Sequence, residues 1–428
     1  MWRILAAGGL TVLLTCGSFA QKSEPSDAEK IRMLMQEVTE LKARVAVLES
    51  RQAPPAESGP AKRAAGEPTQ PIEPQPQAGG PAPSTGTQHD SAGMFPGINI
   101  AGFGAVGFKV TDARPPENAQ LGFRAGANNS FAVGDINLFL TSHLNSRTSV
   151  LGEITFSETS AKEFEVDVER LLLKYDANDY LKTSFGRYHT AVSYYNSIYH
   201  HGQWLQTAVD RPLIVEFSDH GGLLPSQAVG LSVTGQIPSG RLGLNYIFEY
   251  GTSDTHRPTI NGTAVSEIEE NNGQATTAGL FAKPDWMPGL EFGGSYYHDR
   301  INPNGGPLHM GQTIGSVHLI YLTPHVEFLN EGFIVRHNVQ ETGQTFNTPA
   351  FYSLISAKPG SRWRPYFRYQ YVNTSSPVFP DITLRHGPSA GIRFDFNDYV
   401  AFKTQIDRTM RRSLPAFNAL DLQMAFRF

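Results

Sequence analysis

The sequence predicts an all-β protein: a transmembrane antiparallel β-barrel of about 16 strands, preceded by a short coiled-coil helix and a disordered linker. Three observations lead to this prediction. From Gly97 onwards, apolar and polar residues alternate with a period of two, as in strands whose two faces meet different surroundings. Short and long connections alternate between the expected strands, which is typical of transmembrane barrels. The N-terminus has the pattern of an export signal.

The export signal occupies residues 1–20. Arg3 precedes an apolar run over residues 4–14, and Ser18-Phe19-Ala20 has small residues at the positions that precede a cleavage site. We expect a secretory signal peptide removed before Gln21; the alternative is a short hydrophobic helix that is retained. The only cysteine of the chain lies inside this segment, so we expect the mature protein to form no disulfide.

Residues 27–52 carry a heptad pattern. Apolar residues at positions a and d alternate in spacing between three and four, namely Ile31, Leu34, Val38, Leu41, Val45 and Leu48. This narrow seam predicts a coiled coil that associates with other copies. An amphipathic helix packed on its own domain is the alternative. The β-branched residues at a with leucine at d favour two strands, although an attached trimeric domain would impose three.

A linker over residues 53–96 separates this helix from the barrel. It is rich in Pro, Gly, Ala and Gln and has almost no large apolar side chains, so it buries too little surface to offset its chain entropy. The barrel domain therefore spans residues 97–428.

The expected strands follow one another to the C-terminus. They lie near residues 98–111, 131–144, 148–157, 164–176, 180–189, 227–237, 240–252, 274–284, 289–300, 312–323, 325–338, 346–358, 362–373, 385–396, 399–410 and 417–428. Short turns, such as Asn397-Asp398, alternate with longer connections, of which residues 190–226 form the longest. A soluble β-sandwich or solenoid does not require the turns on one side only to be short.

Alternation in the last strand illustrates the two faces. Leu420, Leu422 and Met424 share one face, and Asp421 and Gln423 share the other. A soluble barrel has the apolar face inside, whereas a membrane barrel has it outside, and the pattern alone does not distinguish them. The export signal and the polar second face favour the membrane, with an aqueous lumen.

Over residues 97–428 the chain resembles Gram-negative outer-membrane porins. The terminal Phe428 after alternating apolar residues is similar to their C-terminal insertion signal, and Leu181-Lys-Thr-Ser-Phe-Gly-Arg-Tyr-His resembles the strand before the third loop in phosphate-selective and related porins. The resemblance implies that residues 190–226 fold into the lumen as a constriction, and that the barrel is a homotrimer in the outer membrane. Residues 190–226 lack the dense lysine run of the phosphate-selective subgroup, so the resemblance does not extend to phosphate selectivity.

Charged residues at the strand positions that alternate with the apolar ones are the candidates for lining the pore. Side chains there set the charge that a solute meets. The expected basic wall comprises Arg170, Lys174, Lys182, Arg364, Arg368, Arg393 and Lys403. Opposing acids are Glu249, Glu291, Asp395, Asp407 and Asp421 on strands, with Asp210, Glu216 and Asp219 in the long connection, which also holds Arg211. A basic wall facing an acidic loop predicts a transverse field; the alternative is that these charges only solvate a wide lumen.

Aromatic and histidine side chains mark the same connection. Tyr194, Tyr195, Tyr199 and Trp204 either line a path for sugars or, as we expect, pack the loop against the barrel. His189, His200, His201 and His220 lack cysteine partners and an HxxxH-type spacing. We therefore expect them to hydrogen-bond the loop to the wall and predict no metal site.

The functional prediction is a porin for passive diffusion of small hydrophilic solutes or ions, with the coiled coil in the periplasm, where it is available to a periplasmic partner. A net charge of −5 gives no basic field for nucleic acid, and no cofactor is implied. Three alternatives are an envelope tether, a monomeric channel for hydrophobic solutes, and an outer-membrane enzyme such as a lipase. We expect no enzyme, because nothing in the sequence marks one Ser–His pair over another as a nucleophile with its base.

Overall fold

The computed structural model describes residues 97–112, 130–158, 163–200, 202–216, 223–253, 274–301, 309–374, 378, 383–412 and 414–428. The predicted signal peptide, coiled coil and linker lie outside the described residues, as do His201, Asp219 and His220. The chain divides into two compact units, residues 1–70 and 71–428. Only the second contains described residues, and it is described by itself.

The described part is almost entirely strand. The strands are β1 (Ile98–Thr111), β2 (Ser130–Val133), β3 (Ile136–His143), β4 (Thr148–Glu158), β5 (Phe164–Asn178), β6 (Leu181–His189), β7 (Gln227–Ile237), β8 (Leu244–Ser253), β9 (Ala275–Ala282), β10 (Leu290–Ile301), β11 (Met310–Leu322), β12 (Val326–Val339), β13 (Thr345–Ala357), β14 (Trp363–Asn373), β15 (Leu384–Asp395), β16 (Val400–Arg411) and β17 (Leu414–Arg427). Three short helices accompany them: α2 (Tyr194–Ile198), η2 (Leu213–Val215) and η3 (Gly240–Leu242). None of the described helices is long and apolar enough to cross a membrane.

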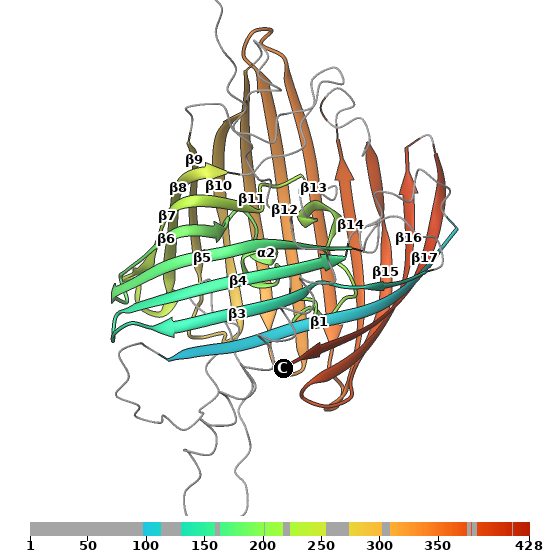
Figure 1. Ribbon diagram of the computed structural model, residues 1–428. Helices are drawn as coiled ribbons and strands as arrows, with labels where there is room; N and C mark the ends of the chain where they lie inside the picture. The colour runs from blue at the N-terminus through green and yellow to red at the C-terminus, as the bar shows by residue number, and fades with distance from the viewer. Residues whose placement is uncertain are drawn as a thin grey trace, which may run out of the picture. The chain divides into compact units, whose positions relative to one another are not determined.

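The strands form one closed antiparallel barrel (Figure 1). From β3 to β17 each strand pairs with the next in sequence, and β1 pairs with β17 to close the ring. Strands β2 and β3 both pair with β1, so they count as one interrupted strand. With β2 and β3 counted together, the described barrel has sixteen strands. Closure leaves no sheet edge with unpaired backbone groups, which is the requirement for strands in a membrane.

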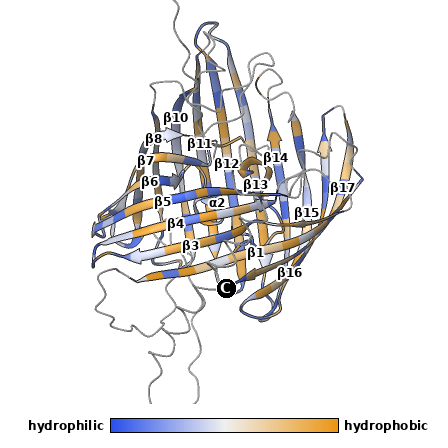
Figure 2. Ribbon diagram, viewed as in Figure 1, coloured by the Kyte–Doolittle hydropathy of each residue, from blue (hydrophilic) through white to orange (hydrophobic). Residues whose placement is uncertain are grey.

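The apolar faces of the strands point outwards. Along β17, Leu420 and Met424 are 39% and 52% exposed, whereas Asp421 and Gln423 are each 1% exposed. Alternating colours along the strands of Figure 2 show the same period. The sense is that of a membrane barrel, with lipid-facing apolar residues and a polar interior. The prediction of an antiparallel transmembrane barrel of about 16 strands is confirmed, while the coiled coil and the linker remain predictions.

A β-bulge in β5 interrupts the alternation. Glu153 of β4 pairs with Arg170, but Ile154 pairs with Val168, so Glu169 is the extra residue. Outward side chains are even-numbered before the bulge, as at Val168, and odd-numbered after it, as at Leu171. The bulge therefore places two consecutive residues, Glu169 and Arg170, on the inner face, and Glu169 is 4% exposed there.

Gly186 of β6 has a backbone conformation and surroundings that exclude larger residues. Its φ is +130°, and a Cβ there would lie 1.9 Å from the carbonyl oxygen of Leu171. Gly186→Ala should therefore lower the free energy of unfolding by about 1–3 kcal/mol, measured by urea titration of the barrel in lipid vesicles. Gly360→Ala, at an exposed turn with open space around it, is the control and should change little. Equal stability of the two variants would contradict this assignment.

Candidate functional site

The long connection between β6 and β7 is closed at its neck by hydrogen bonds. The backbone N–H of Thr190 donates to the carbonyl of Ser226 at 3.1 Å. The side-chain amide of Asn196 donates to the carbonyls of Ser226 at 2.8 Å and Thr190 at 3.1 Å. Since Asn196 belongs to α2, these bonds fix the short helix over the point where the loop (residues 190–226) leaves the wall.

The start of α2 is bound by a carboxylate on the opposite wall. Glu331 of β12 accepts hydrogen bonds from the N–H groups of Tyr194 at 2.6 Å and Tyr195 at 2.9 Å. It also accepts from the hydroxyls of Ser193 at 3.0 Å and Tyr352 at 2.6 Å. The N–H groups of a first helical turn have no partner within the helix, so Glu331 satisfies them and attaches α2 to β12. Figure 1 shows α2 inside the ring of strands.

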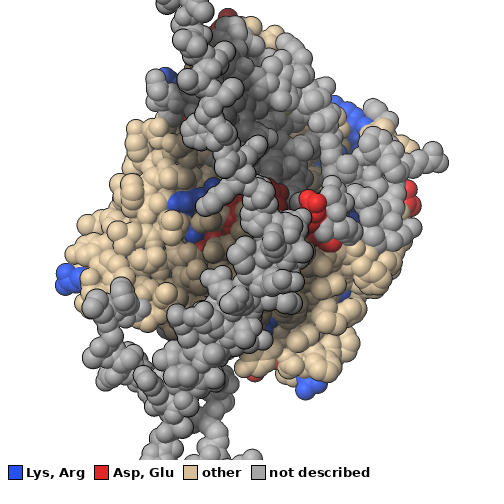
Figure 3. Space-filling model, in the orientation of Figure 1, with Lys and Arg blue, Asp and Glu red and all other residues tan. Residues whose placement is uncertain are grey.

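Basic side chains of the wall bind backbone carbonyls of the loop. Arg393 Nη1 donates to the carbonyls of Trp204 at 2.5 Å and Gln206 at 2.9 Å. Lys403 Nζ donates to the carbonyls of Gln203 at 2.5 Å and Ala208 at 3.0 Å. Lys403 is completely buried. In the face seen in Figure 3, basic and acidic atoms lie close together near the centre.

Arg368 binds the loop through both the backbone and the side chain of Asp210. Its Nη1 lies 2.7 Å from the Asp210 carbonyl oxygen, and its Nη2 lies 2.5 Å from Oδ1. Burial by itself would raise the pKa of the Asp210 carboxyl, but the positive charges of Arg368 and Lys109 outweigh it and hold that pKa below its ordinary value. The contact is therefore charged at neutral pH and is lost only as the pH falls below the ordinary carboxyl range.

The basic wall thus differs from its predicted role in one respect. Arg368, Arg393 and Lys403 face inwards as expected, but they are buried at 1%, 5% and 0% exposure under the loop. These three side chains bind loop carbonyls and Asp210 and therefore do not border open solvent. The sequence pattern gives the direction of these side chains and leaves their partner undetermined.

Aromatic residues of the loop pack against the wall, as predicted. Tyr195 and Tyr199 are 2% and 7% exposed, and the Tyr195 ring meets that of Tyr352 edge-on at 5.8 Å. Ile214 of η2 is also buried, in a cluster that includes side chains of β11 to β14. The Trp204 ring lies under the guanidinium of Arg393, 5.0 Å from its centre. Apolar contact and backbone hydrogen bonds therefore hold the same segment.

The remaining predicted site residues fall into three groups. Arg170 pairs with Glu153 at 2.5 Å, Arg364 pairs with Asp395 at 3.0 Å, and both pairs lie on the wall. Arg211, Glu216 and His200 of the loop are buried, at 8%, 9% and 3% exposure. Lys174 of β5 and Lys182 of β6 are partly exposed, and Lys182 borders the cavity described next.

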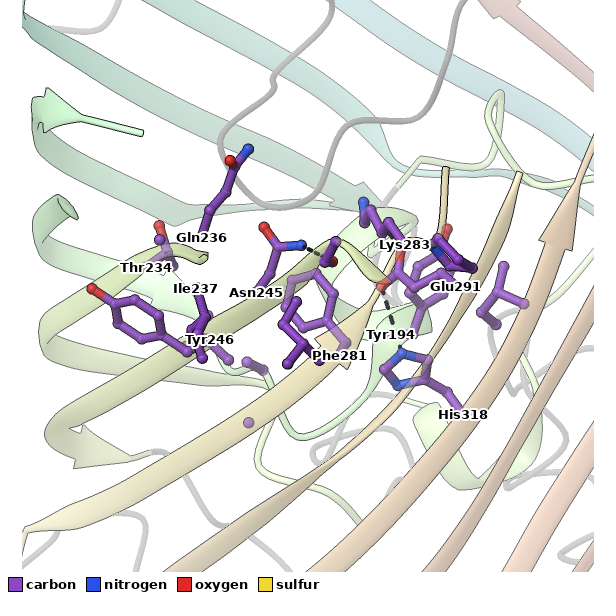
Figure 4. Close-up of a pocket in the computed structure, with 18 of the residues that line it drawn as sticks. Tyr194, Thr234, Gln236, Ile237, Asn245, Tyr246, Phe281, Lys283, Glu291 and His318 are labelled. Carbon is purple, nitrogen blue, oxygen red and sulfur yellow. Dashed lines mark hydrogen bonds and ion pairs between the residues drawn. The ribbon is translucent and has the colours of Figure 1, made fainter. Parts of the chain in front are cut away.

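A cavity of about 780 Å³ lies between the loop and the strands β7 to β11. Figure 4 shows its mixed lining of polar, charged and aromatic groups. Lys283 Nζ lies 3.0 Å from Glu291, and His318 Nε2 lies 3.5 Å from the same carboxylate. Tyr194 of the loop faces them, with its ring 5.7 Å from that of His318. This side of the loop therefore borders open space with fixed charges.

Two important residues were missed by sequence reasoning. Glu331 had the inward parity of β12, but a single acid on a strand gives no sign that it caps a helix about 137 residues away. Glu169 has the outward parity only if the alternation of the later half of β5, in which odd-numbered residues face outwards, is extended back to it. The signal for its bulge is present in the sequence, because the apolar residues of β5 change from even (Val166, Val168) to odd positions (Leu171).

Loss of one wall cation should loosen the loop. Arg393→Met leaves the carbonyls of Trp204 and Gln206 buried without this donor, at a cost of about 1–3 kcal/mol. Proteolysis within residues 190–226 should then accelerate about 5–150-fold, since cleavage follows the open population. Arg241→Met, in which a 75% exposed side chain on a turn is replaced, is the control. Cleavage at the wild-type rate in a folded Arg393→Met barrel would contradict the clamp.

The comparisons with known proteins agree with this architecture. No protein-family model and no curated protein matches the sequence. The structure is similar to an anion-selective porin from Comamonas acidovorans, with a TM-score of 0.53 and 11% identity over 78% of this chain and 99% of that chain. It is also similar to the outer membrane channel DcaP of Acinetobacter baumannii, with a TM-score of 0.52 and 9% identity over 77% of this chain and 97% of that chain. A third similar structure is a loop L8 deletion mutant of OmpT, an outer membrane protein of Vibrio cholerae, with a TM-score of 0.50 and 12% identity over 78% of this chain and 99% of that chain. The chain therefore has the fold of outer-membrane porins.

Proposed function

We propose that this protein is a porin of a Gram-negative-type outer membrane, which forms a water-filled channel for passive diffusion of small hydrophilic solutes or ions. The observation that carries the proposal is the pairing of a closed barrel, polar inside, with a long loop bound across its interior. A polar lumen is needed for hydrated solutes, and a loop bound by buried contacts narrows it to a defined width.

The solute path in this proposal runs along β7 to β11. On the opposite side, Arg368, Arg393 and Lys403 are buried beneath the loop, so that side is closed to solutes. Along β7 to β11 the loop borders the cavity of about 780 Å³, which is lined by charged groups such as Lys283 and Glu291. The loop between these two sides therefore acts as the constriction.

Fixed charges in this path should set its ion preference. Lys283→Gln should make the channel more cation-selective, and Glu291→Gln more anion-selective. Each should change the permeability ratio about 2–6-fold, since a unit charge about 4–8 Å away in water contributes about 0.5–1 kcal/mol. The measurement is the reversal potential of purified protein in planar bilayers under a salt gradient. Arg147→Gln, in which an exposed side chain of a turn outside the cavity lining is replaced, is the control.

Two results would contradict the proposal. Absence of conductance from correctly folded protein would exclude a channel and favour the tether or an enzyme. If all three variants conduct with identical reversal potentials, the protein is a channel, but its solute path does not pass Lys283 and Glu291.

We further propose that the protein is a homotrimer in which the heptads of residues 27–52 add to the association. Deletion of residues 27–52 should weaken the oligomer without unfolding the barrel, because the linker separates the two. Sedimentation in detergent over a range of protein concentrations measures this, and heat-modifiable mobility on gels reports the folded barrel. If the deletion leaves the association constant unchanged, residues 27–52 do not contribute to the assembly of the oligomer.

A further inference from the structure

We propose that Glu169, His189 and His200 form a binding site for a divalent transition metal ion at the root of the loop, with Zn²⁺ as its natural probe. These residues come from β5, the end of β6 and the segment after α2, and one ligand atom of each lies within 4.8 Å of the others. All three are buried, at 4%, 3% and 3% exposure. This site reverses the sequence-based expectation of no metal and does not depend on the proposed channel activity.

The tautomer of His200 is fixed by Asn196. The side-chain amide nitrogen of Asn196 donates to the carbonyls of Thr190 and Ser226, so its Oδ1 must be the atom that faces His200. That oxygen lies 2.8 Å from Nδ1 of His200, which therefore carries the proton. Arg211 Nη2 also approaches Nδ1, at 3.3 Å, but this contact is longer than the one to Asn196. The lone pair of neutral His200 is consequently on Nε2.

This lone pair faces a carboxylate. Nε2 of His200 lies 3.2 Å from Oε2 of Glu169. The same oxygen also accepts a hydrogen bond from the side-chain amide nitrogen of Gln227. Two acceptor atoms at that distance repel each other unless a cation lies between them. Metal–ligand bonds of about 2.0–2.1 Å in a tetrahedral site separate neighbouring ligand atoms by about 3.3 Å, which is close to the spacing found here.

A second imidazole completes the donor set. The ring of His189 lies against that of His200, with centroids 3.5 Å apart and an angle of 30° between planes. Beyond it, Nε2 of His189 is 3.9 Å from a carboxylate oxygen of Glu153, which Arg170 holds in place. A proton shared between His200 and Glu169 would require only those two groups. Two imidazoles and a carboxylate close together in a buried space are the ligand set of a His₂Glu zinc site.

A metal ion at this position would connect three segments of the chain. Glu169 belongs to the wall, His189 is the last residue before the loop, and His200 follows α2. The ion would therefore close the root of the loop as a disulfide closes loops in other proteins. Because the bulge in β5 places Glu169 on the inner face beside Arg170, it has a defined role in this site.

Metal binding to the untagged full chain in detergent, stripped with EDTA, tests the proposal. Calorimetric titration with Zn²⁺ should show one ion bound per folded chain. Glu169→Gln and His200→Gln should each weaken binding at least about 10-fold, and His325→Gln, in which an exposed histidine of a short turn is replaced, should not. Heat-modifiable mobility confirms that each variant is folded.

A second measurement does not depend on the variants. Co²⁺ bound by wild-type protein should give the intense visible absorption of a four-coordinate site with nitrogen ligands, and Zn²⁺ should abolish it. The proposal is overturned if folded wild-type protein shows no saturable Zn²⁺ binding, which is the result expected when a proton alone bridges His200 and Glu169. It is equally overturned if both variants bind Zn²⁺ as tightly as the wild type.

Discussion

The constraint on which this structure depends is that backbone groups inside a barrel must find hydrogen-bond partners. A loop that crosses the lumen has no sheet to join, and each buried N–H or C=O left without a partner costs free energy. Here the wall supplies the partners from side chains. Glu331 binds the first N–H groups of α2, and Arg393 and Lys403 bind carbonyls of the segment that follows.

This arrangement makes the interior asymmetric. Over β14 to β16 the wall and the loop are joined by buried cations, carbonyls and aromatic rings, with Arg368 and Lys403 almost fully enclosed. Along β7 to β11 the same loop borders a cavity of about 780 Å³. Charges on the first side hold the loop in position, whereas Lys283 and Glu291 on the second side border the cavity. In the proposed porin, one set of strands therefore positions the constriction and another lines the path.

Much of this fold could be predicted, because the period of two and the alternation of turn lengths are local properties of the sequence. The loop at residues 190–226 and the inward direction of Arg368 and Arg393 follow from the same pattern. The partners of these residues could not be predicted, since an arginine facing water and one facing a carbonyl have the same parity. Strict alternation also fails at the bulge of β5, where Glu169 joins the inner face. The meeting of Glu169 with His200 depends on that bulge and on the path of the loop, neither of which spacing in sequence reveals.

Amide hydrogen exchange over residues 190–216 in the folded, detergent-solubilised protein tests the central claim most directly. If the wall satisfies the loop backbone, the N–H groups of Tyr194 and Tyr195, bound to Glu331, and of Val209, bound to Gln405 at 3.2 Å, should exchange as slowly as those of the neighbouring strands. Exchange of these amides at the rate of an unstructured peptide, in a barrel whose strands remain protected, would contradict the account.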